Sequence, residues 1–150
     1  MRKAALVLDG AGTGHHVARK LVNLGYPVTL IPYSQLIGFY GKVGNFVAHI
    51  GSESPRQLIV QIRAGAIILT VENERPAGLD SIAALLNIAL NDHGMVAANQ
   101  FWPVLTNREG IFVVDGGKRS ADTAETLALA DKAAAMAACV LAAEADQDAI

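Results

Sequence analysis

The chain has 150 residues, of which 52% are hydrophobic and 17% are charged, and its formal net charge is −2. This length fits one globular domain with a buried core and is too short for a complete two-domain flavoenzyme. The composition argues against a disordered chain, and the small negative charge argues against nucleic acid as a partner.

The chain opens with the pattern of a strand, a glycine turn, a helix and a second strand. KAALVL at residues 3–8 is a short apolar run typical of buried parallel strands. Apolar residues recur at helical spacing over residues 15–24, and Gly25 stands where a helix C-cap glycine belongs. Together with the β-rich run PVTLI at residues 27–31, these elements predict a right-handed βαβ unit.

The next segment has strand-like composition on both sides of a glycine-containing connection. QLIGFYG at residues 35–41 and NFVAHI at residues 45–50 predict a β-hairpin or a bent pair of strands. The run SPRQLIVQIRAG at residues 54–65 fits two structures equally well. It predicts either a helix that begins at Ser54 or an extended segment that leads into the next strand.

Three further elements and a long helix complete the pattern. AIILTVEN at residues 66–73 and IFVVD at residues 111–115 predict buried strands, and GLDSIAALLNI at residues 78–88 predicts a short amphipathic helix. Residues 120–144 predict a long helix with Ser120 as its N-cap. We therefore expect one α/β domain over residues 1–150, a three-layer Rossmann-like fold with a mainly parallel central sheet and a small β-hairpin insertion.

The glycine turn after the first strand is the principal candidate site. It has the strand, turn and helix context of a dinucleotide-binding fingerprint, in which backbone N–H groups and the helix dipole attract phosphate. A tight structural turn is the alternative. The candidate cofactor-binding residues in this turn are Gly10, Ala11, Gly12, Thr13, Gly14 and His15.

A second glycine turn follows the last predicted strand. Asp115, Gly116 and Gly117 precede the long helix, where they would approach a flavin or a phosphate, or else form an ordinary loop. The histidine pair at residues 15 and 16 has no third ligand in its neighbourhood, so no metal site is predicted. The sequence supports no particular catalytic residue, because it has no Ser-His-Asp, paired-carboxylate or P-loop pattern.

Apolar run lengths and the single cysteine bear on compartment and cofactors. The longest apolar runs are far shorter than a membrane span and no signal peptide is evident, so we expect a cytoplasmic protein without a membrane span. Cys139 lies among alanines of the long helix, where we expect it to be buried. One cysteine cannot ligate an iron–sulfur cluster, so any such cluster would belong to a partner or to another part of the protein.

Three stretches of the chain resemble one family. They are YSQLIGFYGKVGNF at residues 33–46, AIILTVENERPAGLDSIAALLNIALNDHGMV at residues 66–96, and PVLTNREGIFVVDGGKRSADTAETLALADKAAA at residues 103–135. Their order and spacing resemble those of the flavoproteins of heterodisulfide reductases. The resemblance implies a Rossmann-like FAD- or NAD(H)-binding fold, with FAD passing electrons between iron–sulfur clusters and other donors or acceptors.

The chain departs from that family in its nucleotide motifs. The family's spacing puts the third fingerprint glycine at Gly14, so that Asp9 and Ala11 stand at the first two glycine positions. An alternative register puts His15 in the third position. At the end of the second strand, where an acidic residue would bind the ribose, the chain has Pro32, and a segment between that strand and the Tyr-Ser stretch is missing.

Two functional hypotheses follow from this comparison of motifs. The first is a domain or component of a heterodisulfide-reductase-like flavin oxidoreductase that transfers electrons with an iron–sulfur partner. The second is a degenerate Rossmann-like scaffold that mediates assembly and binds no nucleotide. The departures lead us to expect weak or absent binding of FAD or NAD(H). The alanine-rich helix, with Phe101 and Trp102, suggests a homodimer or a docking surface in a redox complex.

Overall fold

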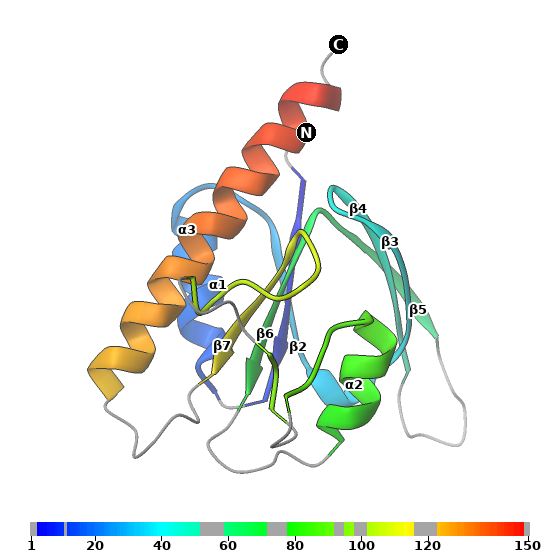
Figure 1. Ribbon diagram of the computed structural model, residues 1–150. Helices are drawn as coiled ribbons and strands as arrows, with labels where there is room; N and C mark the ends of the chain where they lie inside the picture. The colour runs from blue at the N-terminus through cyan, green and yellow to red at the C-terminus, as the bar shows by residue number, and fades with distance from the viewer. Residues whose placement is uncertain are drawn as a thin grey trace.

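The computed structural model describes residues 3–10, 12–51, 59–71, 78–91, 95–97, 102–115 and 123–148. Within these ranges, four strands form a parallel sheet in the order β2-β1-β6-β7 (Figure 1). The strands are β1 (Ala5–Asp9), β2 (Val28–Pro32), β6 (Ala66–Val71) and β7 (Ile111–Asp115). The prediction of a mainly parallel central sheet made of these four runs is confirmed.

A second, antiparallel sheet lies between β2 and β6 in the sequence. A 3₁₀ turn, η1 (Tyr33–Gln35), leads into β3 (Leu36–Lys42), β4 (Asn45–Ile50) and β5 (Val60–Ala64), which pair in that order. The predicted hairpin is therefore correct for β3 and β4, and β5 adds a third strand. For the run at residues 54–65, the extended alternative holds over β5, and residues 52–58 lie outside the described residues.

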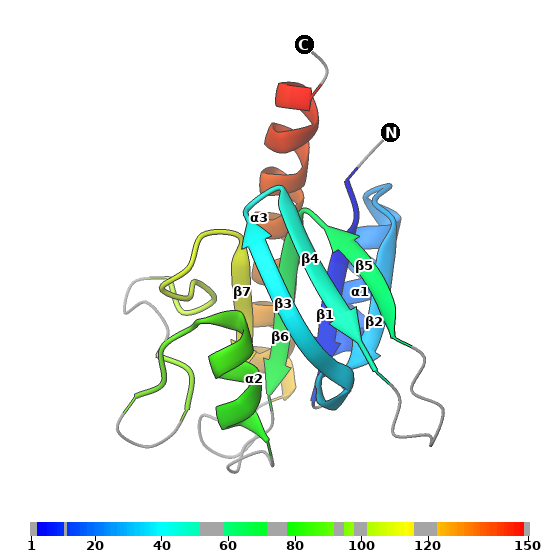
Figure 2. The ribbon, with the colours of Figure 1, turned by 90° about the vertical axis from the view of Figure 1, so that its right-hand side faces the viewer.

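Helices cover one face of the parallel sheet, and the antiparallel sheet covers the other. The helices α1 (Gly14–Asn23) and α3 (Thr123–Asp148) pack against each other and against the parallel strands. On the opposite face lie the antiparallel sheet and α2 (Leu79–Leu86), as the two perpendicular views show (Figures 1 and 2). The fold is thus α/β, with a parallel sheet and a separate antiparallel sheet.

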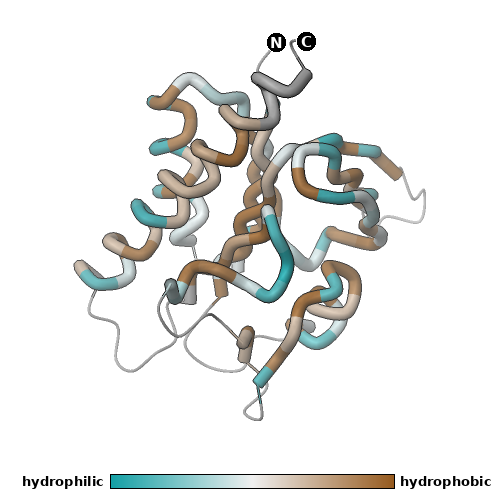
Figure 3. Tube along the Cα trace, turned by 45° about the horizontal axis from the view of Figure 1, so that its top comes forward, coloured by the Kyte–Doolittle hydropathy of each residue, from teal (hydrophilic) through white to brown (hydrophobic). Residues whose placement is uncertain are grey.

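The strands of the parallel sheet are apolar in composition because both faces of the sheet are buried. Leu6 and Leu8 point into the core against the antiparallel sheet, whereas Val7 points into the core under the helices. Ile67 and Ile68 divide in the same way, because successive side chains of a strand point to opposite faces. These runs therefore read as continuously hydrophobic, and Figure 3 shows them as a hydrophobic centre of the molecule.

The ends of the helices agree in part with the sequence predictions. Gly25 follows α1 with a φ of +92° and donates its N–H to the carbonyl of Val22, which confirms it as the terminating glycine. The helix α3 runs from Thr123 to Asp148, beyond the predicted end at residue 144, and the predicted N-cap Ser120 lies outside the described residues.

The helix α3 packs on the sheet through small side chains. Its buried residues are Ala130, Ala133, Ala134, Ala137 and Leu141. Among the described residues, its segment Ala124–Ala143 is long and apolar enough to cross a membrane, by length and composition only. Its most apolar 18-residue stretch has a mean hydropathy of 1.6, and 28% of that stretch is buried. The expectation for Cys139 is wrong, because its side chain is exposed on the outer side of this helix.

Candidate functional site

The glycine turn lies between β1 and α1, at the carboxyl edge of the parallel sheet (Figure 1). Gly10 follows β1, Gly12 has a φ of +79°, and Gly14 is the first residue of α1. A residue with a Cβ would be strained at the φ of Gly12, so the turn itself requires a glycine there. The carboxyl edge is where doubly wound sheets bind ligands, so this turn is the leading candidate for a binding site.

The side chain of Asp9 fills the inner side of the turn. Its Oδ1 accepts hydrogen bonds from the backbone N–H of Gly12 at 2.9 Å, from that of Gly14 at 3.1 Å, and from the hydroxyl of Thr70 at 2.8 Å. The same hydroxyl accepts the N–H of Gly10 at 3.1 Å. One carboxylate oxygen thus receives the donors that a bound phosphate would use in such a turn.

The first N–H groups of the helix also bond within the chain. The N–H of His15 donates to the carbonyl of Gly12 at 3.2 Å, and the N–H of His16 donates to Thr13 at 3.0 Å. If the turn bound a dinucleotide, the N–H groups around residues 11–15 would point outward to its phosphates. In the structure the N–H groups of Gly12, Gly14 and His15 do not do so, because each has an acceptor inside the turn.

Close approach explains two of the three glycines without any ligand. A Cβ at Gly14 would lie 2.8 Å from Oδ1 of Asp9, and a Cβ at Gly10 would lie 2.7 Å from the carbonyl oxygen of Thr70 and against the ring of Tyr33. Real Cβ atoms do not approach other atoms so closely. The glycines therefore let the turn close on its own side chains, which is the structural alternative that the sequence left open.

The end of β2 offers no acidic group for a ribose. Pro32 ends this strand and is exposed, and the next residue, Tyr33, is buried beside Gly10. A tyrosine ring thus stands where the chain leaves the carboxyl edge of the parallel sheet. Its packing contact with the glycine turn also fixes the start of the antiparallel sheet.

The remaining candidate residues are placed only in part. Thr13 makes no capping hydrogen bond with its side chain at the start of α1, and His15 is exposed on the first turn. Asp115 ends β7 and pairs with Val71 of β6, so its backbone lies at the same sheet edge but is separated from β1 by β6. Ala11, Gly116 and Gly117 lie outside the described residues.

A second polar cluster joins α1 to α3. Nε2 of His16 lies 2.7 Å from Oδ1 of Asp131, and Nζ of Lys20 lies 3.6 Å from the same oxygen. The hydrogen bond from His16 holds the pKa of Asp131 below its ordinary value, with a smaller contribution from the charge of Lys20 against the opposing effect of desolvation. This cluster links the two helices at their partly exposed surface.

Sequence reasoning missed Thr70 and Asp131. The signal for Thr70 was a single hydroxyl in the apolar run AIILTV, because a polar group in a buried strand needs a partner. Thr70 is fully buried and is the polar residue in the core of the described part of the chain. Nothing in the local sequence marks Asp131, since its partner His16 lies 115 positions away.

The described residues do not fit a dinucleotide in this arrangement. The pyrophosphate would compete with Asp9 for the N–H groups of Gly12 and Gly14, and it would place its charge beside that carboxylate. In the described part of the chain, no three His, Cys, Asp or Glu side chains lie together as a metal site would need. No protein-family model matches the chain, and no curated protein matches it significantly.

Proposed function

We propose that the chain is a Rossmann-like scaffold domain of a heterodisulfide-reductase-like oxidoreductase, which mediates assembly and binds no nucleotide tightly. The observation that carries this proposal is the position of the Asp9 carboxylate, which accepts hydrogen bonds from Gly12, Gly14 and Thr70. The parallel sheet flanked by helices on one face and by an antiparallel sheet on the other supports the Rossmann-like, three-layer description. The resemblance of the three quoted stretches supports the family.

The carboxylate acts as an internal substitute for phosphate. Because the carboxylate is part of the chain, it binds these N–H groups without the entropy cost of association. An incoming phosphate must pay that cost and also displace the carboxylate. Hydrogen bonds to a charged group contribute about 1.5–3 kcal/mol each, so displacing Asp9 from two N–H groups would weaken binding by roughly two orders of magnitude or more. The displaced carboxylate would then repel the bound phosphate.

A second candidate function is the FAD- or NAD(H)-binding redox component itself. It is favoured by the open space outside Gly12, because no described atom lies within 4 Å of a Cβ placed there. Asp9 is only partly buried, so its side chain has room to leave the turn. In this case a bound FAD would supply the redox chemistry, and the chain would hold it near a cytoplasmic iron–sulfur partner.

Calorimetric titration with FAD, NADH and NADPH separates the two functions. The scaffold function predicts no micromolar binding, which corresponds to about −8 kcal/mol, by a chain whose circular dichroism shows it to be folded. Micromolar binding by the unaltered chain that disappears in Gly14→Val would establish the second function instead. Gly14 is chosen because a larger side chain there collides with Asp9 and so disturbs the turn that would hold the phosphate.

A pair of variants tests the role given to Asp9. Asp9→Gly removes the internal carboxylate and frees the N–H groups of Gly12 and Gly14, so we expect it to gain measurable dinucleotide binding. Asp131→Asn removes a carboxylate on α3 and should gain none. Equal absence of binding in both variants, with both chains folded, would show that Asp9 is not the obstacle.

A further inference from the structure

A cavity of about 520 Å³ lies between α3 and the loop that leads into β7, residues 102–110. The helix contributes Met136, Cys139 and Val140, which share one face of α3 because of their i, i+3 and i+4 spacing. The strand β7, which packs beside α3, contributes Phe112 (Figure 1). The cavity thus lies at the amino-terminal half of β7, away from the glycine turn at the carboxyl edge of the sheet. Its volume is in the range of small-molecule sites.

The walls of this cavity continue the core that lies between the helices and the parallel sheet. Phe112 is buried in that core, with 2% of its surface exposed. Leu105, Met136 and Val140 pack against the same core and are only partly buried. An apolar molecule in the cavity would cover these three side chains and would be stabilised by the removal of apolar surface from water.

The polar groups of the lining have partners within the chain. The hydroxyl of Thr106 donates to the carbonyl oxygen of Ile111 at 2.7 Å and accepts the N–H of Arg108 at 3.2 Å. The guanidinium of Arg108 donates to the backbone carbonyls of Leu86 and Gly41. The lining therefore offers an incoming ligand little hydrogen bonding, which favours an apolar ligand over a polar one.

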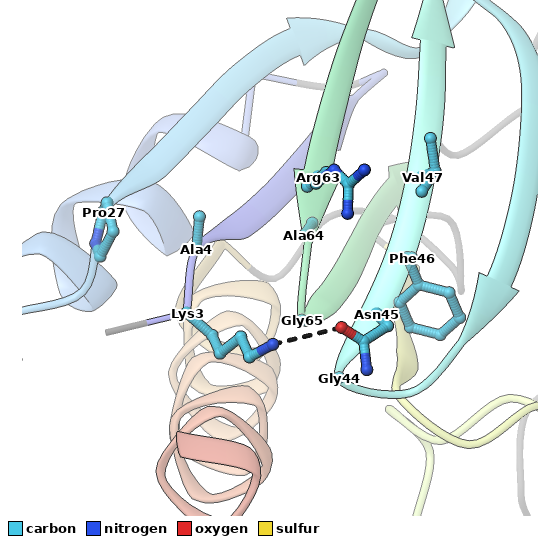
Figure 4. A pocket seen from close by; sticks show the side chains of 10 residues that line it. All are labelled: Lys3, Ala4, Pro27, Gly44, Asn45, Phe46, Val47, Arg63, Ala64 and Gly65. Atoms are coloured by element: carbon cyan, nitrogen blue, oxygen red, sulfur yellow. Dashed lines mark hydrogen bonds between the residues drawn. The ribbon is translucent and has the colours of Figure 1, made fainter. Parts of the chain in front are cut away.

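Charge distinguishes this cavity from one of about 370 Å³ beside the start of β1 and β2. Lys3, Asn45 and Arg63 line that second cavity, and Nζ of Lys3 donates to Oδ1 of Asn45 at 3.2 Å (Figure 4). In the cavity beside α3, the guanidinium of Arg108 is engaged by backbone carbonyls, and Glu109 is an exposed side chain. Its carboxylate disfavours an anionic ligand, and solvent screens its attraction for a cation. An uncharged ligand therefore suits these surroundings best.

We propose that the cavity between α3 and the loop before β7 binds a small uncharged molecule with an aromatic body. The thioether of Met136 is flexible and polarisable, so it adapts to the shape of a ring and makes favourable sulfur–aromatic contacts. Phe112 offers a second aromatic surface to the ligand. Cys139 takes no part in recognition in this proposal and serves as a reporter of occupancy.

The test uses naphthalenemethanol as the uncharged probe and follows the alkylation of Cys139 by iodoacetamide. Cys139 is the single cysteine of the chain and lines the cavity, so a bound ring should shield its thiol and slow the alkylation of native protein several-fold. The half-maximal effect should fall between micromolar and millimolar probe, the range for a ligand of about a dozen non-hydrogen atoms. The backbone amide resonances of Thr106, Gly110 and Val140 should shift over the same concentrations. No such shifts at millimolar probe would overturn the site.

A matched pair of variants tests the apolar wall. Met136→Gln keeps the length of the side chain but places an amide in the wall, so it should weaken binding about tenfold. Met95→Gln makes the same change in the core on the opposite face of the parallel sheet and should leave binding unchanged. Both methionines are only partly buried, and circular dichroism checks that both variants are folded. Equal binding by folded Met136→Gln and the unaltered chain would overturn the assignment of the wall.

Two analogues with the same ring test the preference for an uncharged ligand. Naphthoate should bind about tenfold more weakly than naphthalenemethanol or worse, because its carboxylate would leave water without a cation to receive it. Naphthylmethylamine should bind no more tightly than the alcohol. Tighter binding of the amine that disappears in Glu109→Gln would overturn the preference for an uncharged ligand.

A second copy of the chain is the competing occupant of this cavity. Protection of Cys139 that rises with protein concentration in the absence of any probe would show that a second copy covers the cavity, and it would overturn the small-molecule site. An alkylation rate that is independent of protein concentration is the expected result. None of these results depends on whether the glycine turn binds a nucleotide.

Discussion

Thr70 donates the hydrogen of its hydroxyl to Oδ1 of Asp9 at 2.8 Å, and so joins the middle of the parallel sheet to the turn that leaves it. The two residues lie on neighbouring strands, β6 and β1. Since the hydroxyl also accepts the N–H of Gly10, Thr70 is bonded both to the backbone and to the side chain of the turn. The conformation of the turn is therefore determined by a residue 61 positions away.

Replacing both members of this pair should reveal an interaction energy. We expect Thr70→Val to lower the free energy of unfolding by about 1–3 kcal/mol, because the carboxylate and the N–H of Gly10 lose a buried partner. Asp9→Ala should lower it by a similar amount or more. Urea denaturation of the two single variants and the double variant should give a coupling energy of about 1–2 kcal/mol.

Additive effects of the two replacements would contradict this expectation. Thr29→Val on β2 is a suitable control, because it makes the same chemical change in a partly exposed strand residue. It should change the stability by no more than about 0.5 kcal/mol. An equal loss at both threonines would show that the hydroxyl of Thr70 has no special role.

Two alanine substitutions in the glycine turn should differ in severity. Gly10→Ala places a methyl group 2.7 Å from the backbone oxygen of Thr70, so the strand or the turn must move, at a cost of about 1–3 kcal/mol or more. Gly12→Ala meets no described atom and suffers only from its φ of +79°, which costs about 1–2 kcal/mol. Thermal denaturation should therefore rank Gly10→Ala as the less stable variant, and the reverse order would contradict the packing of Gly10.

The exposed thiol of Cys139 should react with reagents in the native protein. Its side chain lies on the outer side of α3, beside a cavity of about 520 Å³ lined in part by Met136 and Val140. We expect a thiol-specific chromogenic reagent to modify native and urea-unfolded protein at rates within about tenfold of each other, because unfolding adds little access to a side chain that is already exposed. Modification only after unfolding would contradict the exposure.

The parallel sheet could be predicted from the sequence because each of its strands is apolar on both faces. Runs such as KAALVL and IFVVD have few alternatives at that length. The third antiparallel strand could not be assigned, since Leu58, Ile59 and Ile62 fit helical and extended periodicity alike. The exposure of Cys139 could not be predicted, because it depends on which side of α3 faces the sheet. Alanines occur on every side of this helix, so the sequence shows no apolar stripe that would mark the buried side.

The glycine turn was recognised, but its internal bonding was not. The sequence places the negative charge of Asp9 beside the turn. It does not show whether the side chain points outward or back into the turn. That choice depends on Thr70, which becomes a neighbour only when β6 pairs with β1. A contact between residues far apart in the sequence decides the chemistry of a local motif.

The pair of His16 and Asp131 should make the docking of α1 on α3 sensitive to acid. The pKa of Asp131 lies below its ordinary value of 3.8 in the folded chain, chiefly because His16 bonds to its charged form. A group with a depressed pKa stabilises the folded state above its unfolded pKa, and this stabilisation is lost as the pH falls through the folded pKa. Asp131 is 45% exposed, so solvent screening keeps the effect at roughly 0.5 kcal/mol.

Asp131→Asn should therefore be less stable than the unaltered chain near neutral pH. The difference should shrink as the pH falls below the ordinary carboxyl value of 3.8 and vanish below the lowered pKa of Asp131, where the carboxylate is protonated in both states. Denaturation at several pH values measures this difference, and added salt should reduce it. Glu109→Gln removes an exposed carboxylate in the loop before β7 and serves as the control. A pH-independent loss of stability in Asp131→Asn, or an equal loss in Glu109→Gln, would show that the ion pair with His16 does not stabilise the packing of α1 on α3.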